Sequence, residues 1–340
     1  RPPSATSRPE GRAAYIEIRS HTRVTRTNDE HSMPKRKTID LLGIGYCGWD
    51  TLCLVPCIPI DDKVQISRTL TQGGGPAATA TVTAARLGLD GAFLGVVGDD
   101  TRSDAILQAF TDEGVCIDHI RRRSRAESAA AFCWIEEPTG KRSIAWTHGT
   151  AAQLGAEDVT PELVCSARAL HLDGHQTQAA IHAAEIAQKN DIPVFLDAGT
   201  IVPGIGDVIA LCTVVIASEA FAQTFTGLTD IEAAARHIRT LGPSWTGVTA
   251  GPAGSLGFDG QRVVHEGQYP VDVVDTTGAG DVYHGAFTAR YVESIKAQQR
   301  PDLQACMRFA TVVAGLKCRR LGGRTGIPNR TEVERHLQAK

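Results

Sequence analysis

The chain has 340 residues, of which 42% are hydrophobic and 21% are charged, as in an ordinary globular protein. The formal net charge of -3 includes no basic excess, so we expect neither nucleic acid nor a membrane surface as a partner. No stretch reaches the roughly 18 apolar residues of a membrane-spanning helix.

Nine cysteines are present, an odd number without a C-x-x-C pair, and most lie in apolar runs. This pattern indicates reduced core thiols rather than disulfides or a zinc site, which favours a cytoplasmic protein. Residues 1–35 are rich in Arg and Pro and lack an apolar segment. They are predicted to be a disordered N-terminal extension, followed by one domain over residues 36–330 and a short tail over 331–340.

From residue 38 onward, short apolar runs alternate with helical patterns. The predicted strands cover residues 38–43, 92–97, 169–173, 193–197 and 213–217, and the predicted helices cover 77–87, 103–113, 178–189 and 231–240. This alternation predicts an α/β fold with a mostly parallel sheet covered on both faces. Ligands bind beyond the carboxyl ends of the strands in such sheets.

Two regions break the alternation. Residues 52–70 contain prolines and have no helical period, and residues 128–147 have the pattern of a β-hairpin around the turn 138–140. Both segments are predicted to form a small second β-sheet. Strands placed over the ligand end of the main sheet would act as a lid.

The segment Val273-Val-Asp275-Thr-Thr-Gly-Ala-Gly-Asp281 is a predicted strand that enters a glycine-rich turn and then a helix. The backbone N–H groups of such a turn and the helix dipole favour an anion. Gly278 and Gly280 permit close backbone approach, and Asp281 at the helix start can take a proton from an attacking hydroxyl. Asp281 as a plain helix cap is the alternative interpretation, and the whole seven-residue string favours the functional one.

Residues Asp275 to Asp281, followed by His284-Gly-Ala-Phe287, resemble the C-terminal signature of the PfkB (ribokinase-like) carbohydrate kinase family. The resemblance extends over most of residues 38–328. It implies a doubly wound α/β fold with a β lid, ATP with Mg²⁺, and transfer of the γ-phosphate to a sugar hydroxyl. It also implies that Asp281 is the general base and that Gly278, Ala279 and Gly280 form the anion hole.

Two further segments resemble the sugar-binding parts of the family. Residues 43–50 are similar to the first strand with its sugar-contacting aspartate, here Asp50, and residues 73–88 are similar to the N-terminal signature with its glycine pair, Gly74 and Gly75. Family members commonly have Asn at the position of Thr79, so the chain departs from the pattern there, although a hydroxyl can still hydrogen-bond. The strings 171–175 and 217–219 resemble the ketohexokinase-like and sulfofructose-kinase-like branches, which favours a ketose.

On the nucleotide side, residues 248–255 resemble the family's ATP-binding turn, which implies contacts from Thr249, Gly251 and Gly254. Glu219 is a weaker candidate for organising Mg²⁺. Asp275 and Thr277 match positions that carry a monovalent cation in several relatives, so a K⁺ site and a simple backbone cap at Asp275 both remain open.

Two rival functions come from other classes. Residues 43–48 fit the dinucleotide pattern G-x-G-x-x-G, which would suggest an NAD-dependent oxidoreductase, but Pro56 and Pro59 interrupt the helix that this motif requires. A sugar sensor that keeps the fold without the chemistry is the other rival, and such a binder would not need Asp281. The exposed lid strands are expected to pair in a homodimer.

Overall fold

The structure is a computed structural model that describes residues 37–338, so the predicted extension over residues 1–35 lies outside the described part. The main sheet has eight strands in the order β14-β13-β12-β11-β10-β9-β1-β4. These are β1 (Ile39–Ile44), β4 (Gly91–Leu94), β9 (Ala167–Leu172), β10 (Val194–Ala198), β11 (Val214–Ser218), β12 (Trp245–Thr249), β13 (Ser255–Phe258) and β14 (Val263–Glu266). Pairing is parallel from β4 to β12 and antiparallel for β13 and β14.

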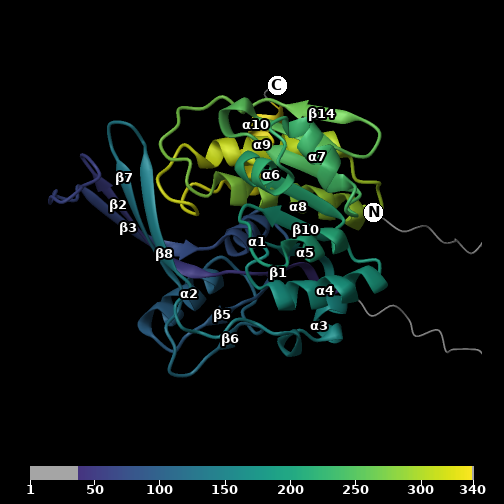
Figure 1. Ribbon diagram of the computed structural model, residues 1–340, viewed down its shortest axis with the longest axis horizontal. Coiled ribbons are helices and arrows are strands. Elements are labelled where there is room, and N and C mark those ends of the chain that lie inside the picture. Colours follow the sequence, from purple (N-terminus) through teal and green to yellow (C-terminus); the bar gives the residue numbers. More distant parts are fainter. Residues whose placement is uncertain (1–36, 339–340) are drawn as a thin grey trace, which may run out of the picture. The chain divides into compact units, whose positions relative to one another are not determined.

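Helices cover both faces of this sheet (Figure 1). One face packs against α1 (Pro76–Arg86), α8 (Ala279–Lys296) and α9 (Leu303–Lys317), and the other against α3 (Pro161–Ser166), α4 (Thr177–Lys189), α5 (Ile205–Leu211), α6 (Glu219–Thr226) and α7 (Ile231–Arg239). Side chains that alternate along a strand supply both cores, since Leu41 belongs to the first and Leu42 to the second. The predicted doubly wound, mostly parallel α/β fold is confirmed.

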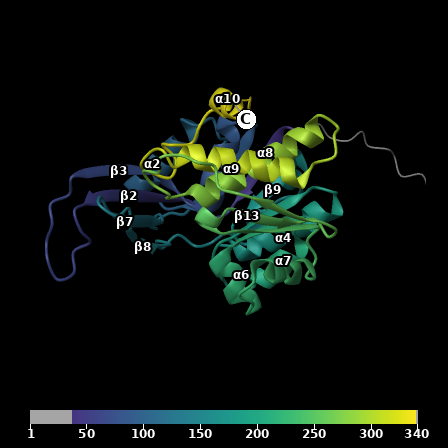
Figure 2. The same ribbon diagram turned by 90° about the horizontal axis from the view of Figure 1, so that it is seen from above.

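A second sheet of four strands has the order β3-β2-β7-β8. Its strands are β2 (Gly48–Val55), β3 (Arg68–Gly74), β7 (Ala130–Glu136) and β8 (Arg142–Thr147). Figure 2 shows it extending away from the helices of the main domain. Because Pro56 follows the last residue of β2, residues 56–67 connect β2 to β3 without continuing the strand. The small additional β-sheet predicted from the sequence is therefore present.

The glycine pattern at residues 43–48 leads directly into β2. A dinucleotide-binding turn requires a helix at this point, whose N-terminus would face the pyrophosphate. The strand removes the structural basis for the oxidoreductase hypothesis.

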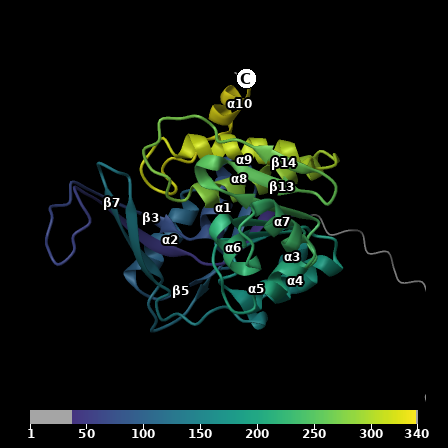
Figure 3. The ribbon, with the colours of Figure 1, turned by 45° about the horizontal axis from the view of Figure 1, so that its top comes forward.

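The remaining elements lie around the two sheets (Figure 3). They are α2 (Thr101–Thr111), the short parallel pair β5 (Val96–Val97) and β6 (Arg121–Arg122), and α10 (Arg330–Gln338), which occupies most of the segment predicted as a tail. Within residues 37–338, no helix has the length and apolar character to cross a membrane.

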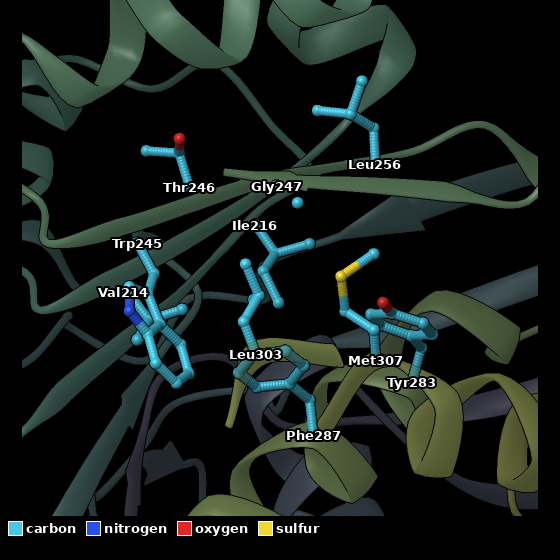
Figure 4. A pocket seen from close by; sticks show the side chains of 11 residues that line it. Val214, Ile216, Trp245, Thr246, Gly247, Leu256, Tyr283, Phe287, Leu303 and Met307 are labelled. Carbon is cyan, nitrogen blue, oxygen red and sulfur yellow. The ribbon is translucent and has the colours of Figure 1, made fainter. Parts of the chain in front are cut away.

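A small pocket lies between the sheet and helices α8 and α9 (Figure 4). Nearly all of its lining side chains are apolar, and they come from Val214, Ile216, Trp245, Thr246, Gly247, Leu256, Gly257, Tyr283, Phe287, Leu303 and Met307. No carboxylate reaches it. It is a gap in the packed core, and the chemistry-bearing residues lie at the carboxyl ends of the strands instead.

Candidate active site

The site begins where the chain order of the sheet reverses, between β1 and β9. Asp173 directly follows β9, and its Oδ2 accepts hydrogen bonds from the backbone N–H of Tyr46, 2.9 Å away after β1, and of Ala77, 3.2 Å away in α1. Helix α1 has Gly75 at its N-cap, which offers no side chain, so Asp173 supplies the cap from another strand. Ligands of open α/β sheets bind at this kind of switch point.

The predicted sugar-binding residues come together beside Asp173. The carboxylate of Asp50 lies over Gly74, so a Cβ at Gly74 would collide with it. Gly75 has φ 105° and its missing side chain leaves room for the carbonyl of Tyr46, so only glycine fits there. Thr79 is buried on α1, one turn after Gly75.

Sequence reasoning missed Arg324, which completes this group. It is 5% exposed, and it donates from Nε to Thr79 Oγ1 and from Nη2 to the carbonyl of Gly74, both at 3.3 Å. Its Nη1 has no hydrogen-bond partner among the described residues. Burial lowers the pKa of Arg324 to about 10, against the attraction of Asp50. Arg324 lies 245 positions after Thr79 in the chain, and nothing in the sequence indicated that the two residues are in contact.

The turn from Asp275 to Asp281 is held by its own first residue. Asp275 Oδ1 accepts from the backbone N–H and the hydroxyl of Thr277, at 2.8 and 2.7 Å, and Oδ2 accepts from the N–H of Gly322 at 2.8 Å. Burial opposes ionisation of Asp275, but these hydrogen bonds and the Lys317 charge hold its pKa below the ordinary value. The carboxylate therefore caps local backbone and ties the turn to the segment after α9.

The two glycines of the turn have different surroundings. Gly278 has φ 71°, and a Cβ there would lie 2.9 Å from the Cα of Gly323. A Cβ at Gly280 would meet no atom within 4 Å outside its chain neighbours and the backbone of its own helix, and Gly280 is exposed. Helix α8 begins at Ala279, so the free N–H groups of its first turn face this open space.

Asp281 lies in the first turn of α8 and is partly exposed. Burial and the charge of Asp173 raise its pKa to about 6, against the opposing effect of Lys317 and Arg324. Burial also raises the pKa of Asp197 well above the usual range, and its Oδ1 lies 3.3 Å from Nε2 of His284. Three acids from β9, β10 and α8 thus share one region, and Asp281 has a basicity suited to proton transfer near neutral pH.

The predicted nucleotide residues lie at the ends of neighbouring strands. Thr249 ends β12 and is paired in register with Ser218, the residue before Glu219 at the exposed start of α6. Gly251 is the first residue of the short 3-10 helix η2 (Gly251–Ala253) and Gly254 directly follows it, with φ 53° and 89°. Next to Gly254, Ser255 Oγ lies 3.1 Å from the hydroxyl of Tyr283 on α8, so this turn packs on the helix that carries Asp281.

The second sheet reaches the site through β8. Arg142 Nη1 donates to the hydroxyl of Thr276 at 2.8 Å. Trp146, on the same side of β8, is 54% exposed and its ring lies 4.7 Å from His148 and 6.4 Å from His175. The backbone N–H of His175 in turn donates to Asp173. The sequence gave no reason to choose Arg142, because nothing local distinguishes it from other arginines.

Comparisons with known proteins agree with this geometry. The family described as pfkB family carbohydrate kinase matches residues 48–330. A ribokinase of Bacillus subtilis is 30% identical over 304 residues, covering 86% of this chain and 98% of the relative. The structure of Arabidopsis thaliana ribokinase complexed with ribose and ATP has a TM-score of 0.77 at 24% identity, covering 88% of this chain and 99% of that one. Ribokinase from Giardia lamblia has a TM-score of 0.80 at 20% identity, covering 88% and 100%.

The fold is therefore ribokinase-like, with its acids and glycine-rich turn at the carboxyl edge of the sheet. The chain belongs to the pfkB family of carbohydrate kinases and is a phosphotransferase of that class.

Proposed function

We propose that this kinase transfers the γ-phosphate of ATP to a hydroxyl of a sugar, with Asp281 as the general base. Asp281 takes the hydroxyl proton, the oxygen attacks the γ-phosphorus in line, and the bond to the ADP oxygen breaks. The backbone N–H groups of Gly278, Ala279, Gly280 and Asp281 stabilise the charge on the phosphoryl oxygens. The observation that carries this proposal is the position of Asp281, with its raised pKa, at the exposed N-terminus of α8 beside the open space at Gly280.

The two substrates would enter from opposite sides of α8. The acceptor would lie against Asp50, Gly74, Gly75 and Thr79, and ATP against Thr249, Gly251 and Gly254. The ribose and ATP in the Arabidopsis structure, and the ATP and Mg²⁺ in one solved E. coli protein of this fold, support a sugar and ATP with Mg²⁺ as the substrates here. Mg²⁺ would bind as part of the nucleotide substrate, and Glu219 would help to organise it. The described residues contain no cluster of three or more His, Cys, Asp or Glu able to hold a metal by themselves.

For the acceptor we propose a ketose-type sugar, with ribose as the comparison substrate. Thr79 supports a difference from ribose at this subsite, because it takes the place of the expected Asn and is bonded to Arg324. The relatives point the other way, since they include ribokinases and deoxyribokinases. A screen of ketohexoses, ribose and deoxyribose by coupled ADP release decides between them. Higher kcat/KM for ribose would refute the ketose preference without affecting the kinase assignment.

The decisive test of the chemistry is Asp281→Asn. We expect kcat to fall at least roughly 10²-fold, the scale of a lost general base, while ATP binding is kept. Asp104→Asn, in the first turn of α2, is the matched control and should leave kcat unchanged. Near-normal turnover in the Asp281 variant would overturn the assignment. If no sugar stimulates ADP release by the unmodified protein, the sensor hypothesis replaces it.

We further propose that the protein is cytoplasmic and forms a homodimer through the second sheet. All nine cysteines lie in the described part and are free thiols, which suits a reducing compartment. Phe132 on β7 is 49% exposed, and its register partner Thr51 lies on the same face of the sheet, opposite to the buried side chains of Cys133 and Ile135. An exposed aromatic side chain on this face, in a sheet whose edge strands β3 and β8 are unpaired among the described residues, is suited to contact with a second copy of the chain.

A further inference from the structure

Lys317, the last residue of α9, is 0% exposed although it carries an ammonium group. Its Nζ donates to the backbone carbonyl of Asp275 at 2.9 Å. Asp275 is the first residue of the turn that ends at Asp281. The side chain therefore links the end of one core helix to the start of the candidate anion-binding turn.

A buried ammonium is costly unless charges of opposite sign and hydrogen-bond acceptors surround it. Burial lowers the pKa of Lys317, while the carboxylates of Asp275 and Asp281 act against that shift. Arg142 on β8 is a further cation in the surroundings and acts in the same direction as burial. Asp275 and Asp281, the first and last residues of the turn, thus favour the charged form of Lys317 together with the neighbouring Cys318.

The carboxylate of Asp275 does not depend on Lys317 for its hydrogen bonds. Thr277 and Gly322 supply neutral donors to both of its oxygens. The ammonium instead binds the carbonyl oxygen of Asp275 and places a positive charge beside the position that a monovalent cation at Asp275 and Thr277 would take, so the two cations would repel each other. The residues present therefore do not fit the K⁺ site considered from the sequence.

We propose that Lys317 is a positioning residue that acts as a fixed monovalent cation for the Asp275–Asp281 turn, so that the enzyme needs no K⁺. An ammonium group and K⁺ carry the same charge, are of similar size and bind the same carbonyl oxygens. The covalent attachment of Lys317 holds this charge in place at any salt composition. The effect of Lys317 on turnover rests on the proposed kinase function.

The first measurement uses the unmodified protein. We expect its kcat to change less than about twofold when K⁺ is replaced by Na⁺ or by a Tris counterion, because the turn already has its cation. Thermal unfolding should likewise show no stabilisation specific to K⁺. Activation or stabilisation by K⁺ of the unmodified protein overturns the proposal, and neither result depends on whether any variant folds.

The second measurement compares Lys317→Ala with Lys317→Met. The alanine variant opens space at the Asp275 carbonyl, whereas the methionine variant fills that space without charge. We expect both to lose kcat by about 10²-fold or more, the scale of a lost oxyanion-stabilising group. K⁺ or NH₄⁺ should restore kcat and raise the melting temperature in the alanine variant alone. Full activity of the alanine variant without K⁺, or a folded alanine variant that no cation restores, also overturns the proposal.

Failure of the kinase proposal gives a different outcome. In that case no sugar is phosphorylated with any cation, and thermal unfolding still decides the role of Lys317. K⁺ that stabilises the alanine variant and leaves the unmodified protein unaffected supports the fixed-cation role, and the reverse pattern refutes it.

Discussion

Gly278 and Gly280 lie two positions apart, but the fold requires glycine at the first and the proposed ligand requires it at the second. The backbone of Gly278 requires φ 71° and has Gly323 against it, so the fold itself demands glycine. Gly280 is the second residue of α8 and faces open space, so only a bound phosphate would exclude a side chain.

Alanine substitutions separate these two constraints. Gly278→Ala should cost roughly 1–2 kcal/mol of folding free energy, because an L-residue resists the left-handed region. Gly280→Ala should keep or raise stability by up to about 1 kcal/mol, since alanine favours a helix. We expect its kcat nevertheless to fall at least about tenfold through steric exclusion of the phosphoryl group. Urea unfolding and steady-state kinetics check both, and an active Gly280→Ala enzyme would refute the anion hole.

The raised pKa of Asp281 also predicts a pH dependence. A general base must be ionised, so the competent fraction of enzyme falls as the pH drops through about 6. Burial also raises the pKa of Asp50 to about 6, and a second ionisation there would steepen the acid limb. We expect kcat/KM to decline on the acid side by about tenfold per pH unit, or more steeply, and Asp50→Asn to make the limb shallower. A profile that stays flat between about pH 5 and 7 would contradict this role.

At the level of elements, β8 is the strand that contacts the Asp275–Asp281 turn. Arg142→Gln removes the positive charge and the hydrogen bond from β8 of the second sheet to Thr276 in the turn. We expect kcat to fall and the KM of ATP to rise, each by about three- to tenfold, because lid closure orders the site and excludes water. Arg122→Gln on β6, whose partner is Asp104 on the surface, is the matched control and should change neither. Equal kinetics for the two variants would remove Arg142 from the closing mechanism.

At the level of the whole molecule, the outward face of the second sheet predicts association. The chain has a mass of 36.2 kDa, and light scattering should report about twice that value, since an unpaired edge strand beside the exposed Phe132 favours pairing. Phe132→Glu should yield monomers with unchanged circular dichroism. A monomeric unmodified protein would refute the dimer.

The sequence was sufficient for most parts of the site that are local in the chain. The strand predicted at Val273 and Val274 was wrong, because both side chains are exposed and no strand in the described part of the chain pairs with them. The turn, the start of the helix and the position of Asp281 could be predicted from the string Asp275–Asp281, because all three depend only on the backbone geometry of consecutive residues. The alternation of short apolar runs with helical patterns similarly predicted a doubly wound sheet, because buried parallel strands have few alternative patterns. The glycine pattern at residues 43–48 was the misleading signal, and the strand that follows it removed that hypothesis.

Only the tertiary structure decided which residues from distant parts of the chain lie around the Asp275–Asp281 turn. Asp173 reaches Tyr46 and α1 through the neighbouring positions of β9 and β1 in the sheet. Arg324 and Lys317 come from the C-terminal segment and α9, and their burial sets the charge around Asp281. A sequence pattern fixes backbone geometry over a few residues, whereas the electrostatics of a site depend on charges brought together by packing across the whole chain. The turn that identifies the kinase was visible in the sequence, and the cation that stands beside it was not.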